Sequence, residues 1–253
     1  MPEFFDQYLV YHPAPWENRD WQSIAGIPLE DVWFQTEDRV RLFGWYAPNP
    51  RSSAVLLWCH GNAGNIIHRL DNLVRLQEVG VSVFLFDYRG YGRSQGRPSE
   101  VGLYRDALAA YTYLTETRRL SPKQIIIFGR SLGAAVATQL ASVRPAAGLV
   151  LESAFPSIEA IARYYYYGLP VHWLLGARFP LEERLKEVHM PVLVVHGALD
   201  DIIPFELGKR VFEAANAPKS FYAIPNADHN NVFVVGGPPY YERLKKFVDE
   251  VVG

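Results

Sequence analysis

The sequence predicts an α/β fold with a mostly parallel, doubly wound sheet of about eight strands. Short apolar runs alternate with helical patterns along most of the chain. Several runs, such as "VSVFLFD" and "PVLVVHG", are apolar throughout, as expected for strands that are covered on both faces. The first two runs follow each other without an intervening helix, which predicts an antiparallel hairpin at the start of the sheet.

We treat residues 1–253 as one domain, because no repeat or linker divides them. The expected strands lie at 30–36, 39–46, 54–60, 81–87, 124–129, 147–151, 191–196 and 219–224. The expected helices lie at about 66–79, 100–118, 132–143, 206–215 and 239–251. Residues 154–187 interrupt this alternation with a segment that is rich in aromatic residues. We expect a small helical cap there, over the carboxyl ends of the strands, where open α/β sheets bind ligands. The alternative is a peripheral helical excursion whose aromatic side chains only pack.

The composition argues against several classes of protein. With 49% hydrophobic residues the chain can bury a full core, and its net charge of −2 predicts no basic surface for nucleic acid. A single cysteine, Cys59, excludes an internal disulfide and favours a reducing compartment. No apolar run reaches the roughly 18–20 residues of a membrane span. The first residues lack the pattern of a signal peptide. We therefore expect a cytoplasmic protein without evident membrane association, unless a native anchor precedes this sequence.

The stretch "IIIFGRSLGAAVATQL" combines an expected strand, a sharp turn and an expected helix. Gly129, Ser131 and Gly133 form the pattern G-x-S-x-G at the turn, which is typical of a nucleophile elbow. The glycines suit the turn because a Cβ at either position would crowd the backbone that exposes Ser131. Ser131 is therefore the candidate nucleophile.

A nucleophilic serine needs a base and an acid that orients the base. His229 follows the last expected strand in the polar turn "NADHNN", and Asp200 follows the strand "VLVVHG". The chain order Ser131, Asp200, His229 is the order that accompanies a nucleophile elbow. Asp201 and Glu152 remain alternatives for the acid. His196, at the end of its strand, is expected to support the loop that carries the acid, while Asp228 caps the turn beside His229.

Acyl transfer also requires hydrogen-bond donors for the oxyanion of the tetrahedral intermediate. The backbone N–H of Leu132, directly after Ser131, is the first candidate. The loop "HGNAGN" follows the strand "VLLWC" and precedes a helix, so the N–H of Asn62 is the second. In the cap, Tyr164, Tyr165, Tyr167, His172 and Trp173 are expected to wall an apolar substrate pocket.

No metal or cofactor is expected. The sequence has no H-E-x-x-H or C-x-x-C pattern. The glycines of "GYGRSQG" are spaced G-x-G-x-x-x-G, which differs from the dinucleotide-binding spacing. We expect Asp87 and Arg89 to brace that loop instead. Cys59 is interpreted as a small buried side chain rather than a nucleophile.

Six blocks of the sequence together resemble the α/β-hydrolase superfamily of serine hydrolases over nearly the whole chain. They are "HGNAGN", "FDYRGYGRSQG", "GRSLGAAVA", "LESAF", "PVLVVHGALDDIIP" and "DHNN". Within the superfamily they are similar to the subgroup that contains protein depalmitoylases and bacterial esterases. The resemblance implies the fold described above, with a Ser131, Asp200 and His229 triad and an oxyanion hole at Asn62 and Leu132.

Together the motifs predict a serine hydrolase that needs no cofactor and acts on small-molecule carboxylic esters or thioesters with an apolar group. An amidase or peptidase of the same fold is the first alternative. A ligand-binding protein without catalytic activity is the second, since one fold hosts many functions.

Overall fold

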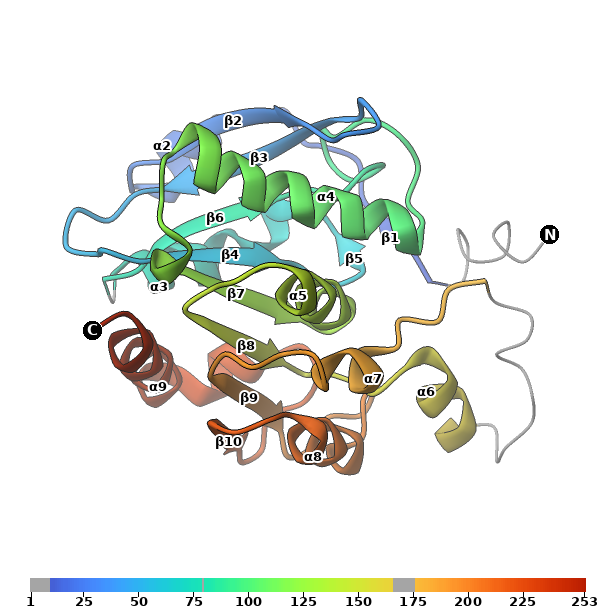
Figure 1. Cartoon of the computed structure of the whole chain (residues 1–253). Coiled ribbons are helices and arrows are strands. Elements are labelled where there is room, and N and C mark those ends of the chain that lie inside the picture. Colours follow the sequence, from blue (N-terminus) through green and yellow to red (C-terminus); the bar gives the residue numbers. More distant parts are fainter. Residues whose placement is uncertain (1–9, 79, 166–175) are drawn as a thin grey trace.

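The computed structural model describes residues 10–78, 80–165 and 176–253. A central eight-stranded sheet has the strand order β10-β9-β8-β7-β4-β6-β3-β2 (Figure 1). Its strands are β2 (Glu30–Gln35), β3 (Arg41–Ala47), β4 (Val55–Cys59), β6 (Ser82–Phe86), β7 (Ile125–Arg130), β8 (Gly148–Glu152), β9 (Val192–Gly197) and β10 (Lys219–Ile224). β3 pairs antiparallel with both β2 and β6, while the other neighbours in the sheet are parallel. The predicted fold class and the initial hairpin are confirmed.

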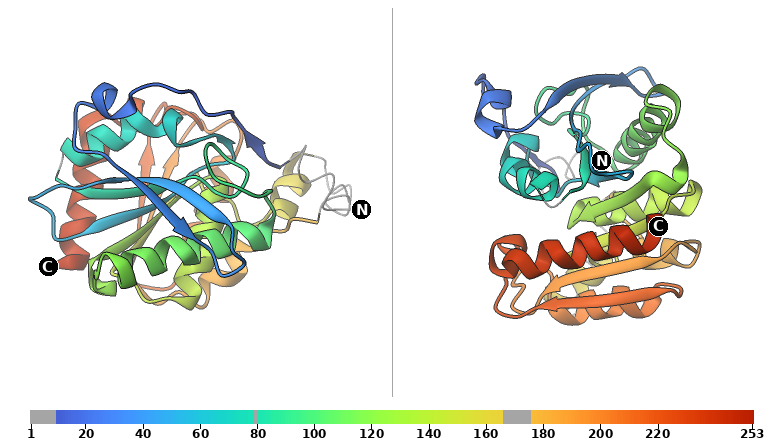
Figure 2. Two further views of the ribbon diagram at one scale, coloured as in Figure 1. Left: turned by 90° about the horizontal axis from the view of Figure 1, so that it is seen from above. Right: turned by 90° about the vertical axis from the view of Figure 1, so that its left-hand side faces the viewer.

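The central strands are apolar throughout because both faces of the sheet are covered. Every residue of β4, β6, β7, β8 and β9 is buried. Two hydrophobic cores result, one on each face, and the two views of Figure 2 show helices on both sides of the sheet.

One core includes buried side chains of α2 (Trp21–Ala25), α3 (Leu70–Glu78) and α9 (Val232–Val252). The other includes side chains of α4 (Glu100–Thr112), α5 (Leu132–Val143), α7 (Leu181–Leu185) and α8 (Phe205–Ala214). Each helix contributes leucine, valine, phenylalanine or alanine side chains to its core, so the helical faces and the sheet bury one another.

Several helices differ in extent from the sequence-based expectation. The expected helix at 66–79 begins as a 3₁₀ turn, Ile66–Arg69, and that at 100–118 ends in a π turn, Tyr113–Thr117. α9 begins seven residues before the expected position 239, and it is interrupted at Gly237, where φ is 50° and ψ is −147°. Two prolines follow Gly237, and they account for the break because proline supplies no backbone donor.

Two short strands were not expected from the sequence. β1 (His12–Pro13) pairs in parallel with β5 (Ala63–Gly64), which lies directly after β4. The segment before α2 is therefore fastened to the loop that follows β4.

The expected cap at 154–187 is described at its two ends only. α6 (Ile158–Tyr165) lies beyond the carboxyl ends of the strands (Figure 1). α7, at the other end, packs its buried Leu181 and Leu185 into the core of the sheet. A single domain with a cap insertion stays a prediction.

None of the helices in the described part of the chain combines the length and apolar character required to cross a membrane.

Candidate active site

Ser131 lies at the sharp turn between β7 and α5. Its φ of 53° and ψ of −121° place it in a region that residues with a side chain rarely occupy. The turn is tight on both sides: a Cβ on Gly129 would lie 2.4 Å from the carbonyl oxygen of Gly133, and one on Gly133 would lie 2.0 Å from that of Cys59. The two glycines thus allow the strained turn that presents Ser131.

Ser131, His229 and Asp200 form a chain of hydrogen bonds, although they follow three different strands. Nε2 of His229 lies 3.0 Å from Oγ of Ser131. Nδ1 of His229 lies 2.9 Å from Oδ2 and 3.1 Å from Oδ1 of Asp200. An ionised carboxylate only accepts, so Nδ1–H donates to Asp200 and Nε2 is left to accept the Ser131 proton. This arrangement has the geometry of a serine nucleophile with its base and orienting acid.

The loop after β9 also holds the Asp200 carboxylate. The backbone N–H groups of Ile202 and Ile203 donate to Oδ1 at 3.0 and 2.7 Å. Burial opposes ionisation, but the hydrogen bond and charge of His229 and the Ile203 amide outweigh it and lower the pKa of Asp200. His196, as expected, supports this loop: its Nε2 donates to the Ile203 carbonyl at 2.8 Å.

The two alternative acids do not contact His229. Asp201 is exposed at the surface of the loop. Glu152 is fully buried and engaged elsewhere: Nε of Arg130 lies 3.0 Å from its Oε1, and the Tyr240 hydroxyl donates to its Oε2 at 2.5 Å. Arg130 also donates to the backbone carbonyl of His229 at 2.7 Å. The guanidinium therefore connects the nucleophile turn to the loop of His229.

The loop after β4 brings Asn62 beside the nucleophile. A Cβ on Gly61 would lie only 3.6 Å from Cβ of Ser131, so this backbone runs close to the serine. Within the described residues, the backbone N–H groups of Asn62 and Leu132 have no protein acceptor. Both residues line the same cavity as Ser131. Their amides are thus available to an oxygen atom of a ligand.

The β1 segment fixes this loop in place. The Asn62 carbonyl accepts from the His12 N–H at 3.2 Å and from the Tyr91 hydroxyl at 2.8 Å, while the Asn62 amide side chain donates to the Val10 carbonyl at 3.0 Å. The position of Asn62 therefore depends on residues about fifty positions earlier in the sequence.

A cavity of about 790 Å³ opens at this site. Its apolar wall consists of Val10, Leu132, Phe155, Ile158, Ile161, Ile202 and Ile203. Its polar wall includes His12, Asn62, His68, Arg69, Arg130, Ser131, His229 and Asn230. Arg69 and Arg130 were not expected at this site from the sequence, although Arg130 stands within the G-x-S-x-G pattern itself.

The aromatic residues expected to wall the pocket are placed differently or lie outside the described residues. Tyr164 and Tyr165 are exposed by 51% and 43%, and neither lines the cavity. The hydroxyl of Tyr165 donates to the carbonyls of Asp201 and Ile202. α6 instead directs Ile158 and Ile161 toward the cavity, since these two residues share one face of the helix. Tyr167, His172 and Trp173 lie outside the described residues.

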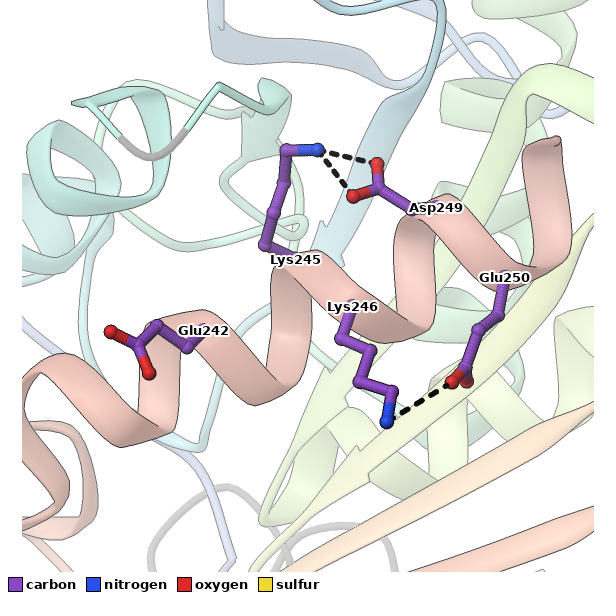
Figure 3. A pocket seen from close by; sticks show the side chains of 5 residues that line it. All are labelled: Glu242, Lys245, Lys246, Asp249 and Glu250. Atoms are coloured by element: carbon purple, nitrogen blue, oxygen red, sulfur yellow. Dashed lines mark hydrogen bonds and ion pairs between the residues drawn. The ribbon is translucent and has the colours of Figure 1, made fainter.

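A second hollow, of about 600 Å³, lies along the exposed side of α9 and carries only charged side chains (Figure 3). Lys245 pairs with Asp249, and Lys246 pairs with Glu250 at 3.8 Å. These are pairs of residues four positions apart on a solvated helix. No serine, cysteine or histidine is among the described residues that line this hollow, so the cavity at Ser131 is the candidate active site.

The described residues contain no group of three or more histidine, cysteine or acidic side chains that could hold a metal ion. Cys59 is buried, and burial raises the pKa of its thiol to about 12. The Arg89 guanidinium pairs with Asp38 and Asp106, both at 2.8 Å, beneath the "GYGRSQG" loop. Its role is structural, in agreement with the expectation for this loop.

A family model described as serine aminopeptidase, S33, matches residues 50–181, which include the loop after β4 and the Ser131 turn. The protein belongs to this family of α/β-hydrolases. The described fold, with its β-sheet and the turn at Ser131, is similar to that of a solved structure, the Pyrococcus furiosus esterase Pf2001. That structure aligns with a TM-score of 0.81 at 22% identity, over 96% of this chain and 99% of the esterase.

Two relatives of the hydrolase illustrate the range of the family. The uncharacterised protein Rv2307c of Mycobacterium tuberculosis is 43% identical over 245 residues, which cover 96% of this chain and 86% of the relative. The lysophosphatidylserine lipase ABHD12 of Danio rerio is 36% identical over 199 residues, which cover 70% of this chain and 51% of the lipase. The family match and the lipase relative support hydrolase activity. The narrower subgroup suggested by "HGNAGN" stays a prediction.

Proposed function

We propose that this α/β-hydrolase cleaves carboxylic esters, including thioesters, through an acyl-enzyme intermediate. One observation carries the proposal: the hydrogen-bonded chain Ser131–His229–Asp200 ends in a strained serine that faces a cavity. An esterase among the structures of the same fold and a lipase among the relatives are in keeping with it.

In the proposed reaction, His229 takes the proton of Ser131 while Oγ attacks the acyl carbon. The Asn62 and Leu132 amides donate to the oxyanion, and Asp200 stabilises the imidazolium. His229 then protonates the leaving alcohol or thiol, which departs. Water attacks the acyl-enzyme by the same route, with His229 as base, and releases the acid and free Ser131.

The apolar wall of the cavity supports an apolar acyl or alcohol group. Ile158, Ile161, Ile202 and Phe155 present aliphatic and aromatic surface next to Ser131. Burial of such a group contributes roughly 0.8 kcal/mol for each methylene. A preference for esters with several methylenes over acetate esters follows from this wall.

Peptide hydrolysis, which the description of the matched family raises, has less support from the cavity. An aminopeptidase binds a cationic amino terminus, and a carboxylate is the natural partner for that charge. No carboxylate is among the described residues that line the cavity, whereas two arginines are. A cationic substrate end is therefore disfavoured.

The first prediction concerns Ser131→Ala. We expect turnover of p-nitrophenyl butyrate to fall at least about 10⁴-fold, because the nucleophile is lost while the oxyanion donors remain. Labelling by a fluorophosphonate should disappear as well. Ser142→Ala, in the last turn of α5, is the matched control and should retain both properties. Undiminished labelling of Ser131→Ala would contradict the proposal, and efficient cleavage of alanine p-nitroanilide by the unaltered enzyme would favour the peptidase.

A further inference from the structure

Arg69 is a cation that lines the cavity and has no paired carboxylate among the residues that the structure describes. It ends the 3₁₀ turn Ile66–Arg69, directly after the loop that carries Asn62. Its guanidinium donates to the carbonyls of Ala63 and His68 at 2.6 and 3.4 Å, and its buried Nε has no partner. Within the described residues, no carboxylate oxygen lies in ion-pair contact with it.

The two buried arginines of the described residues are both paired with carboxylates. Arg89 contacts Asp38 and Asp106, and Arg130 contacts Glu152. Unpaired buried charge is costly, and proteins ordinarily avoid it. Arg69, by contrast, is only partly buried: it faces the cavity, and its guanidinium has no carboxylate partner among the described residues.

The surroundings of Arg69 leave its charge largely uncompensated. Burial, and next the charge of Arg130, lower its pKa to about 10, so the guanidinium is still protonated at neutral pH. The carboxyl groups of Asp87 and Glu152 attract the Arg69 guanidinium without an ion-pair contact, and both carboxyl groups are buried. Burial raises the pKa of Asp87 to about 7, which leaves that carboxyl only partly ionised at neutral pH.

The order of the strands separates the cationic wall from the apolar wall. Ser131 follows β7, Arg69 follows the neighbouring strand β4, and Phe155 and Ile158 follow β8 on the other side of β7. The cavity thus presents a cation on one side of the nucleophile and apolar side chains on the other. An ester with one apolar and one anionic half matches this distribution.

We propose that Arg69 binds an anionic group of the substrate, a phosphate or a carboxylate, while the apolar half lies against α6. This inference rests on the proposed ester hydrolysis and specifies its substrate class. Arg69 is then a specificity-determining residue, because a guanidinium with a free N–H forms a strong, charge-assisted hydrogen bond with either anion.

The test compares three esters with the same acyl chain: 1-octanoylglycerol, its 3-phosphate, and the octanoyl ester of glycerate. The unaltered enzyme should show a higher kcat/KM for an anionic ester than for the neutral one. In Arg69→Gln, this ratio of anionic to neutral kcat/KM should fall about 10- to 100-fold, mainly through KM. Arg69→Lys should retain part of the ratio, and the matched control Arg75→Gln, on the exposed side of α3, should retain all of it.

The phosphate ester and the carboxylate ester together identify which anion is bound. A preference for either of them over the neutral ester supports the proposal. Equal losses on all three esters in Arg69→Gln would overturn it, since that result is expected if Arg69 only holds the Ala63 loop. If Arg69→Gln does not fold, equal rates of the unaltered enzyme on neutral and anionic esters overturn it as well.

A binding measurement separates this inference from the proposed function. Calorimetry should show that octyl phosphate binds the unaltered protein more tightly than octanol, and that Arg69→Lys weakens this difference. That result supports the anion site even if no ester is cleaved. A lack of ester cleavage would refute only the hydrolase proposal. Equal affinity for octyl phosphate and octanol would refute the anion site.

Discussion

At the scale of single residues, Arg130 has the widest influence on the site. Its guanidinium contacts the buried Glu152 carboxylate and the carbonyl of His229, and the next residue in the chain is Ser131. A buried ion pair is not itself evidence of stability, but the loss of one partner leaves an uncompensated charge. Arg130 is therefore a positioning residue for His229 as well as the partner of Glu152.

We expect Arg130→Met to lower the free energy of unfolding by about 3–5 kcal/mol, because Glu152 is left buried without its cation. The double variant Arg130→Met, Glu152→Gln should recover much of this loss, since glutamine is neutral and still accepts from Tyr240. Its kcat for esters should nevertheless stay about 10-fold or more below that of the unaltered enzyme, because the His229 carbonyl has lost its donor. Urea unfolding and steady-state kinetics measure the two effects. Recovery of kcat together with stability would show that Arg130 has no positioning role.

The residues of the site differ in how well the sequence could reveal them. Ser131 stands in a local pattern of glycines, and Asp200 and His229 each follow an apolar strand, so their spacing predicted that they would meet. Arg69 stands in no such pattern, and Arg130 occupies a variable position of the glycine pattern, where an arginine is ordinarily expected to be a solvated side chain. Only the three-dimensional structure shows which arginines have carboxylate partners.

At the scale of elements, the position of the loop after β4 depends on the β1 segment, which we call the strap. Asn65 is the central residue of this attachment: it is fully buried and donates to the carbonyls of Ala14 and Pro15 at 3.2 and 3.1 Å. Its side-chain oxygen accepts from the N–H of Ile67 and caps the turn that leads to α3. One side chain thus joins the strap, the loop and the turn.

Asn65→Ala should therefore lower both stability and catalysis. We expect a loss of about 1–3 kcal/mol in the free energy of unfolding, because the buried Asn65 side chain no longer joins the Ala14 and Pro15 carbonyls to the amide of the turn. The kcat for p-nitrophenyl butyrate should fall as the Asn62 amide loses its fixed position. Asn216→Ala is the matched control, since Asn216 bridges the carbonyls of Leu185, Lys186 and Val188 away from the cavity. A reduced kcat in the control as well would refute a specific role of the strap.

The elements that were predicted and those that were missed differ in length. All eight strands of the sheet were predicted because each spans at least five residues and contains a run of three or more apolar side chains. β1 and β5 have two residues each, which is too short for any periodicity to be recognised. The aromatic segment after β8 was set apart as a cap, which stays a prediction. The tyrosines of α6 were nevertheless expected to line the pocket, whereas Ile158 and Ile161 do so, because composition does not reveal which face of a short helix is turned inward.

At the scale of the whole molecule, stability depends on a buried, mostly neutral pair, His60 and Asp87. Nε2 of His60 lies 3.6 Å from Oδ1 of Asp87, and neither side chain is exposed to solvent. Burial, followed by the charge of Arg69, lowers the pKa of His60 to about 3, whereas burial raises that of Asp87 to about 7. Both shifts reflect the cost of placing a charge in the interior.

The two shifts have opposite effects on the pH dependence of unfolding. Between about pH 4 and 6.5 the unfolded His60 binds a proton that the folded residue does not, so stability falls as the pH falls. Over the same range folded Asp87 retains a proton that the unfolded residue has released, so stability falls as the pH rises. The contributions of the pair therefore largely cancel in this window.

Asp87→Asn should remove the cancellation. We expect urea midpoints of this variant to decline from pH 6.5 to pH 4.5 more steeply than those of the unaltered protein. The added slope should approach about 1.4 kcal/mol per pH unit in the free energy of unfolding. At pH 8 the variant should be no less stable, because asparagine keeps an acceptor for the Ile66 amide and carries no buried charge. Parallel pH profiles for the two proteins would contradict this assignment.

The strand order also has a consequence for the timing of synthesis. Ser131 follows a strand in the middle of the sheet, Asp200 follows β9, and His229 follows β10 at the edge. A nascent chain contains the proposed nucleophile long before it contains the proposed base, which follows the outermost strand. A ribosome-bound or truncated chain that ends before residue 229 therefore carries a serine without a proton acceptor. The hydrogen bond between Ser131 and His229 can therefore form only after β10, the strand at the edge of the sheet, has been synthesised.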